Sequence, residues 1–166
     1  MGLAIREASE VDAAMLSDLI RVAFADVAAR FGLTPENCPR HPSNCTPEWV
    51  SSAMIKGTRY FVAEADGEAA GCVALEQAGP DVCYLERLAV LPTRRRCGLG
   101  AALVERIFRG ATGLGASRVE IGVIARHTEL TRWYEKQGFR PTRTATFEHL
   151  PFEVLFMSAE LRAPGK

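Results

Sequence analysis

The sequence lacks a surplus of charge of either sign, and this bears on its partners. The chain of 166 residues contains 20 basic and 20 acidic residues, so its formal net charge is 0. Proteins that bind nucleic acid or anionic membrane surfaces carry an excess of basic residues. We therefore expect neither nucleic acid nor a membrane among the partners of this protein.

Long hydrophobic runs, export signals and an even set of cysteines are also absent. No stretch is apolar for long enough to cross a bilayer, and the segment MGLAIREASEVD has no charged-then-apolar signal pattern. The five cysteines are Cys38, Cys45, Cys72, Cys83 and Cys97. An odd number, with two in expected strands, favours free thiols over a disulfide framework. We expect a cytoplasmic protein.

The chain length and the absence of internal repeats predict one domain over residues 1–166. The hairpin signal at Asp66-Gly67 predicts strands at 59–65 and 69–77, and a nearly continuous apolar run predicts a central strand at 82–90. Strands are also predicted at 3–7 and 118–124, with a closing antiparallel pair at 144–147 and 152–161. Helical periodicity and caps predict helices between Ser9 and Gly32, from Pro47 to about Gly57, at 98–109 and at 127–137. This order of elements indicates a mixed α+β fold, a sheet flanked by helices.

Residues 94–108, RRRCGLGAALVERIF, place three arginines and two glycines at the start of a predicted helix. The first N–H groups of a helix lack partners, and the helix dipole is positive there. Gly98 and Gly100 let an anion approach the backbone closely, and the arginines add charge-assisted hydrogen bonds. The stretch therefore predicts a phosphate or pyrophosphate site. The alternative is a simple turn and helix cap with solvated arginines.

Two common nucleotide-binding motifs do not account for this stretch. A dinucleotide fingerprint needs a third glycine or alanine where Leu103 stands, and it needs an N-terminal βαβ unit that the sequence lacks. The Gly-Lys-Ser/Thr of a P-loop is absent. Neither motif explains a phosphate site at this place.

Two segments in fixed order carry a more specific pattern. The strand LERLAV is followed by Pro92 and by R-x-x-G-x-G at residues 95–100, and the strand RVEIGVI leads into HTELTRWYEKQGF. The first resembles the acetyl-coenzyme A motif of the GNAT N-acetyltransferase superfamily, and the second is similar to its N-x-x-A-x-x-x-Y-x-x-x-G-F segment. Tyr134, Gly138 and Phe139 match the second motif, with His127 in place of the usual Asn. The resemblance covers most of the chain and is strongest over 82–140.

The resemblance implies a fold and a cosubstrate. It implies a twisted, mostly antiparallel sheet of about seven strands flanked by about four helices, with strands 82–90 and 118–124 splayed apart. It implies acetyl-CoA as cosubstrate, with the pantetheine arm lying in the splay. The residues that it implies for acetyl-CoA binding are Leu88, Ala89, Val90, Arg95, Arg96, Cys97, Gly98, Leu99, Gly100, Ala101 and His127.

The resemblance also implies direct acetyl transfer, and the chain has no nucleophile elbow that would suggest an acyl-enzyme. An alkylamine with a pKa near ~10.4 needs a base before it can attack. Glu86 lies in an otherwise apolar strand, where burial would raise its pKa; the alternative is a structural pair with a cation, and Glu120 is a weaker substitute. Tyr134 matches the family's general acid, or else it is a core aromatic.

The acceptor side of the site is expected in two variable segments, 33–46 and 144–152. His41 and His149 lie there, either as groups that tune acceptor binding or as exposed loop histidines. Cys38, His41 and Cys45 are too few for a closed zinc site, so no metal is expected. Trp49 is expected either in the pocket wall or in the core. No feature of the sequence selects one acceptor.

Together these observations predict an acyl-CoA-dependent N-acetyltransferase that acts on a primary amine of a small molecule or peptide. The alternative is a non-catalytic acyl-CoA-binding sensor or regulatory module. Both need the phosphate loop, but only the enzyme needs Tyr134 and a base. A homodimer is the expected assembly, by resemblance to the family.

Overall fold

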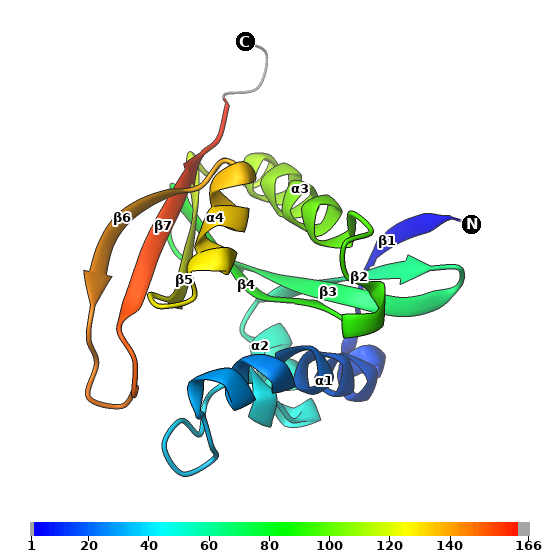
Figure 1. The fold of residues 1–166 in the computed structure, drawn as a ribbon. Helices are drawn as coiled ribbons and strands as arrows, with labels where there is room; N and C mark the ends of the chain where they lie inside the picture. Colours follow the sequence, from blue (N-terminus) through cyan, green and yellow to red (C-terminus); the bar gives the residue numbers. More distant parts are fainter. Residues whose placement is uncertain (1, 163–166) are drawn as a thin grey trace.

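A computed structural model describes residues 2–162 and places a seven-stranded sheet between two layers of helices (Figure 1). The strands are β1 (Leu3–Glu7), β2 (Arg59–Ala65), β3 (Glu68–Gln77), β4 (Val82–Val90), β5 (Arg118–Ile124), β6 (Arg140–Ala145) and β7 (Val154–Glu160). The helices are α1 (Ala13–Phe31), α2 (Pro47–Ile55), α3 (Leu99–Gly113) and α4 (Thr128–Lys136). The sheet order is β1-β2-β3-β4-β5-β7-β6, and only β4 and β5 pair in parallel. The predicted α+β fold is confirmed.

The sheet has a hydrophobic core on each of its two faces. In Figure 1, α1 and α2 cover one face, and α3 and α4 cover the other. Side chains of a strand alternate between faces, so Tyr60 and Val62 of β2 pack towards α1 and α2, whereas Phe61 packs towards α3. Each fully buried side chain of this size contributes roughly 1.5–3 kcal/mol to folding. The apolar alternation of the strands therefore determines both layers.

Helix caps predicted from the sequence occur where expected. Ser9 and Asp12 form a capping box, but they cap a 3-10 helix at Glu10–Asp12 that leads into α1. Gly32 ends α1 in the left-handed conformation, at φ +65°. The Thr46 hydroxyl accepts a hydrogen bond from the Trp49 amide at 3.3 Å, which starts α2.

Two element boundaries differ from the prediction by four residues, and several others differ by one or two. Helix α3 continues past residue 109 to Gly113, and Gly110 within it faces the sheet, where an added Cβ would lie 2.9 Å from Leu75 Cδ2. Strand β6 begins at Arg140, four residues before the predicted 144. Its side chains are almost all exposed, so apolar alternation could not reveal it. Pairing with β7 defines that strand.

The parallel pair at the centre of the sheet is broken, as the resemblance implied. Strands β4 and β5 pair only from Val82 to Tyr84 on the β4 side. Just beyond, Val73 of β3 faces two residues of β4, Arg87 and Leu88, which is a β-bulge. Arg87 takes φ +55°, a conformation that is rare outside glycine. The bulge bends β4, and its last residues have no strand partner on the β5 side.

We expect the packing of α3 on the sheet to contribute strongly to stability. Leu103 is completely buried between α3 and the sheet, so Leu103→Ala should lower the free energy of unfolding by about 2–5 kcal/mol. Urea denaturation followed by circular dichroism measures this loss. Ile55, which is 76% exposed, is the control, and Ile55→Ala should change stability by about 0.5 kcal/mol or less. Equal losses in the two variants would contradict the packing described here.

Candidate functional site

The turn between β4 and α3 presents a series of unused backbone N–H groups. After a 3-10 helix at Pro92–Arg94, Arg96 and Gly98 take positive φ values of +66° and +83°. Within residues 2–162, no acceptor is found for the amides of 96–101, and the next amide, that of Ala102, donates to Gly98 O at 3.1 Å. Successive free amides in turns of this kind, at a helix N-terminus, form a concave anion site. The turn can therefore hold a phosphate group.

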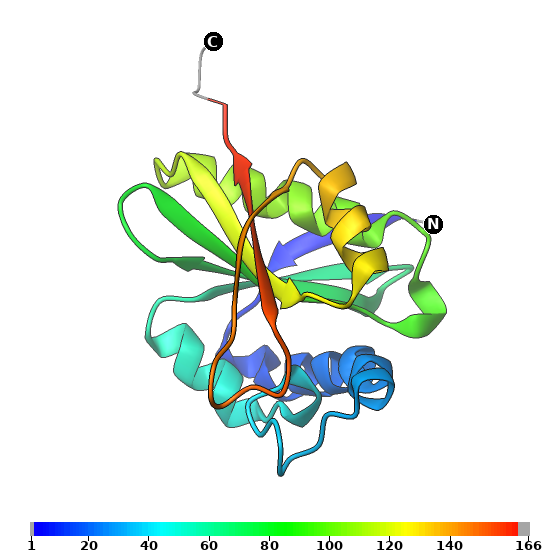
Figure 2. The same cartoon turned by 60° about the vertical axis from the view of Figure 1, so that its left-hand side comes forward.

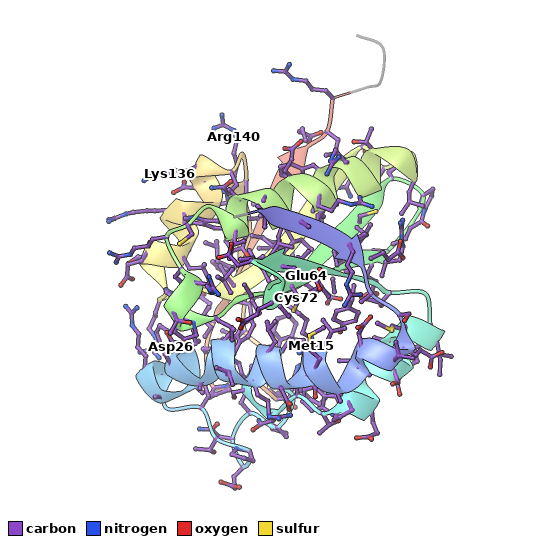
Figure 3. The ribbon with its side chains drawn as sticks, turned by 90° about the vertical axis from the view of Figure 1, so that its right-hand side faces the viewer. Met15, Asp26, Glu64, Cys72, Lys136 and Arg140 are labelled. Carbon is purple, nitrogen blue, oxygen red and sulfur yellow. The ribbon has the colours of Figure 1, made fainter. Side chains whose placement is uncertain are left out.

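The side chain of Arg95 holds this turn in place. Its guanidinium donates to the Asp26 carboxylate and to Ala23 O of α1, both at 2.7 Å, and to Val90 O at 3.1 Å. Figure 3 shows Asp26 on the part of α1 that lies beneath the turn. The hydrogen bond from Arg95 lowers the pKa of Asp26. Arg95, which the sequence suggested as a phosphate-neutralising cation, thus has its guanidinium bound to protein atoms, and no local sequence signal links it to Asp26.

The two glycines of the motif serve different purposes. Gly98 is at φ +83° with open space around it, so glycine is needed there for its conformation. Gly100 has an ordinary helical conformation, but an added Cβ would lie 3.0 and 3.2 Å from two carbons of the Trp133 ring. Glycine at position 100 therefore permits the close packing of α3 against α4.

A cavity of about 650 Å³ lies where β4 and β5 separate. Glu86 and Leu88 of β4, His127 and Tyr134 are among the side chains that line it. Part of each predicted variable segment also reaches the cavity, through Arg40, His41, Pro42, Leu150 and Phe152. The two segments pack against each other, and Figure 2 shows the β6–β7 connection reaching the α1–α2 connection.

The remaining residues that the sequence suggested for acetyl-CoA binding lie around this cavity and the turn. Ala89 is buried against the α1 side of the sheet, and Val90 O accepts the bond from Arg95. Cys97 is exposed, and its thiol is 3.5 Å from Arg95 O. Nδ1 of His127 is buried without a hydrogen-bond partner among the described residues, and burial followed by the charge of Arg30 lowers its pKa.

Tyr134 both packs in the core and lines the cavity. It is 6% exposed and makes edge-to-face contacts with Trp133 and Phe139 at ring distances of 5.1 and 5.4 Å. Its hydroxyl has no hydrogen-bond partner within residues 2–162. Burial raises the pKa of the phenol, so the group keeps its proton at neutral pH. The two sequence interpretations of Tyr134 are therefore compatible.

Glu86 is a half-buried carboxyl without a cation partner. No Lys, Arg or His nitrogen of the described residues lies within ion-pair distance of it. Burial, and then the hydrogen bond and negative charge of Glu76, raise the pKa of Glu86 to about 7. Glu120, the weaker candidate, accepts a hydrogen bond from Arg118 Nε at 2.8 Å. Glu76 was missed because its closeness to Glu86 comes from strand register.

A second cavity, of about 780 Å³, lies on the other side of Glu86. Its wall includes Trp49, Tyr60 and Glu76. Glu86, Arg87 and Arg40 line both cavities. The carboxyl of Glu86 can therefore be approached from two directions.

His41 is buried, contrary to the exposed-loop interpretation, whereas His149 is exposed. Nδ1 of His41 accepts a hydrogen bond from the Ser43 amide at 3.2 Å and lies 2.7 Å from Ser43 Oγ. Burial, and then the nearby charge of Arg87, lower the pKa of His41 to about 4. Within the described residues there is no metal-binding group of His, Cys, Asp and Glu side chains, and all five cysteines are unpaired.

Comparison with known proteins agrees with this geometry. The chain matches the model of the Acetyltransferase (GNAT) family over residues 25–139. An uncharacterised N-acetyltransferase of Mycobacterium bovis is 30% identical over 132 residues, which are 74% of this chain and 85% of the relative. The PaiA N-acetyltransferase from Thermoplasma acidophilum, solved in complex with coenzyme A, has a TM-score of 0.79 and 18% identity, covering 96% of this chain and 99% of that one.

The chain belongs to the GNAT acetyltransferase family. An uncharacterised N-acetyltransferase of Schizosaccharomyces pombe is also 30% identical, over 106 residues. The match spans 63% of this chain and 64% of that relative's length.

We expect His41 to make folding sensitive to mild acid. Between pH 6.5 and 4 the unfolded chain binds a proton at this position and the folded chain does not, so stability falls as the pH falls. From pH 7 to pH 5 the loss from this group should be about 2 kcal/mol. Glu86, with its pKa raised to about 7, contributes in the opposite direction over the same range, so the contribution of His41 is the difference between the parent protein and a His41 variant, each unfolded in urea at both pH values. His41→Asn, which keeps an acceptor for the Ser43 amide, should show a smaller loss; an identical loss would disprove the assignment.

Proposed function

We propose that this protein is an acetyl-CoA-dependent N-acetyltransferase that transfers acetyl directly to a primary amine of a small molecule or peptide. The observation that carries the proposal is that Glu86 and Tyr134 approach one cavity from opposite sides of the split sheet. One side chain suits proton removal and the other suits proton donation. The family to which the chain belongs supports acetyl transfer as the reaction.

The residues around the split fit coenzyme A. The free amides of 96–101 match a pyrophosphate, and Arg96 is an exposed cation beside them. Leu88, Ala89 and Val90 have no strand partner on the β5 side, so their backbone can pair with an extended pantetheine amide chain. His127 lies in the wall of the same cavity. The Thermoplasma structure contains coenzyme A in the same fold, and acetyl-CoA would supply an activated thioester.

Proton transfer follows from the two ionisable side chains. An alkylammonium must lose a proton before its nitrogen can attack, and a base with a pKa near the working pH is the most effective. Glu86, with a pKa of about 7, meets that requirement. As the new C–N bond forms and the C–S bond breaks, the phenol of Tyr134 gives its proton to the departing sulfur. The raised pKa of Tyr134 ensures that this proton is present.

The cytoplasm is the location that we propose. The five unpaired thiols support a reducing compartment. Separately, no helix within residues 2–162 has the length and apolar character to span a bilayer.

The amide donors of the turn can be tested one at a time. Ala101 is exposed in the first turn of α3, and Gly100 before it has no Cβ to clash with a proline ring. Ala101→Pro removes one free N–H and no helix hydrogen bond, so coenzyme A affinity should fall on the order of tenfold or more. Isothermal titration calorimetry measures this.

Ala101→Ser is the matched control, because it keeps the amide and should bind coenzyme A as the unchanged protein does. Both variants should unfold, without ligand, within about 1 kcal/mol of the parent. Equal coenzyme A affinity in the proline and serine variants would argue against the cradle.

Catalysis and simple sensing are distinguished at Glu86 and Tyr134. Glu86→Gln should lower kcat/KM by about 10² to 10⁴, and Tyr134→Phe should lower kcat, with coenzyme A affinity little changed in both. Thiol release over a panel of primary amines measures turnover. Coenzyme A binding without turnover of any amine by the unchanged protein would favour the sensor.

The pH dependence provides a further check on Glu86. A base must be deprotonated to act, so kcat should rise with pH through about 7, the pKa of Glu86. This rise should disappear in Glu86→Gln, while any rise at higher pH from the amine itself remains. A rise near pH 7 that persists in the variant would assign the base elsewhere.

A further inference from the structure

Two arginines share one indole between the two cavities. The guanidinium carbon of Arg40 lies 4.8 Å from the Trp49 ring centroid, and that of Arg87 lies 5.6 Å from it. The three side chains come from the α1–α2 connection, the bulge of β4 and α2. Stacking on an aromatic face holds a guanidinium in a defined orientation and leaves its N–H edge available. The indole therefore holds both cations close to one ring, in the region where the two cavities share residues.

Neither of these guanidiniums has an acidic partner among the described residues. Seven other arginines lie within 4.0 Å of a carboxylate, namely Arg6, Arg21, Arg30, Arg59, Arg94, Arg95 and Arg118. Arg87 is half-buried and also takes a strained conformation. Arg40 is exposed, and the charge of Arg87 acts on the adjacent Glu86 carboxyl without an ion pair between them. A partly buried cation that lacks a hydrogen-bonded carboxylate can receive one from a ligand.

These cations border the place where the amine must lie. Arg40, Arg87 and Glu86 line both cavities. His41 in the same wall is neutral at pH 7 and adds no charge. Glu48 and Glu76 also line the second cavity, but neither is within ion-pair distance of the two arginines. The acceptor site thus offers a carboxyl base with two unneutralised guanidiniums beside it.

We propose that the acceptor is an amino acid whose carboxylate is bound by Arg40 and Arg87 while its amine faces Glu86. This inference rests on the proposed N-acetyltransferase function. Planar guanidiniums match a carboxylate with paired N–H donors. A polyamine or a simple alkylamine, protonated at neutral pH, would bring a positive charge to this pair without an anion to offset it, which disfavours such acceptors.

Matched acceptors that differ only in the carboxylate test this inference. The probes are the protein L-amino acids and their carboxamides, with thiol release measured in the presence of acetyl-CoA. At least one amino acid should have a kcat/KM on the order of tenfold or more above that of its carboxamide. Carboxamides that are acetylated as well as every free acid would overturn the inference.

Substitution of the arginines shows whether they cause the preference. Arg40→Gln and Arg87→Asn should each lower kcat/KM for the free acid on the order of tenfold and leave the carboxamide little changed. Asparagine suits the positive φ at position 87. Arg126→Gln is the control, because Arg126 stacks on Phe31 at 5.4 Å but lines neither cavity. A preference that survives in both Arg40 and Arg87 variants would disprove their role.

A binding measurement separates this inference from the proposed function. Thermal stabilisation of the coenzyme A complex by the same amino acids and carboxamides does not depend on turnover. Stabilisation by free acids that is lost in Arg40→Gln and Arg87→Asn supports the carboxylate site even if no amine is acetylated, in which case only the transferase proposal fails. If amines are turned over but free acids have no advantage in binding or in rate, the transferase proposal stands and the carboxylate site is wrong.

Discussion

The broken pairing between β4 and β5 is the constraint on which the rest of the site depends. Three residues of β4 pair in parallel with β5, and the bulge at Arg87 and Leu88 then bends β4 away. Unpaired backbone is costly inside a sheet, so a split of this kind persists only where a ligand or solvent satisfies it. The same bulge that opens the cavity also directs Glu86 and Arg87 into its wall. The cavity, the proposed base and the cation beside it thus arise from one irregularity in one strand.

The turn after β4 also presents polar groups that have no partner within the described part of the chain. Its backbone amides remain free because Arg95 holds the turn from behind, through Asp26 and Ala23 of α1. A side chain thereby positions the backbone and leaves its amides available for the proposed phosphate. Charge in the other half of the site is arranged in a comparable way, because the Trp49 indole positions Arg40 and Arg87 without neutralising them. The proposed binding of coenzyme A and of a carboxylate would use these two sets of polar groups, one in the turn and one at the indole.

Much of the fold was predictable because its information is local. The apolar runs of β2 to β5, the turn signal between β2 and β3, the caps at Ser9 and Thr46, and the glycine that ends α1 all act within a few residues. Strand β6 was placed too late because its exposed side chains have no apolar period, and only pairing with β7 defines it. The motif residues Gly98 and Tyr134 were found by resemblance, but packing alone distinguishes Gly98, needed for its φ, from Gly100, needed to admit Trp133.

By itself, the sequence determined the order of elements, the split sheet through its family motifs, and the side chains Glu86 and Tyr134 as candidates for proton transfer. Only the tertiary structure decided what surrounds them. Strand register brings Glu76 to Glu86 and raises its pKa, the fold buries His41, and three distant segments bring Arg40, Trp49 and Arg87 together. The physical reason is that a motif specifies local backbone geometry, whereas desolvation and the pairing of charges depend on contacts between residues far apart in the chain.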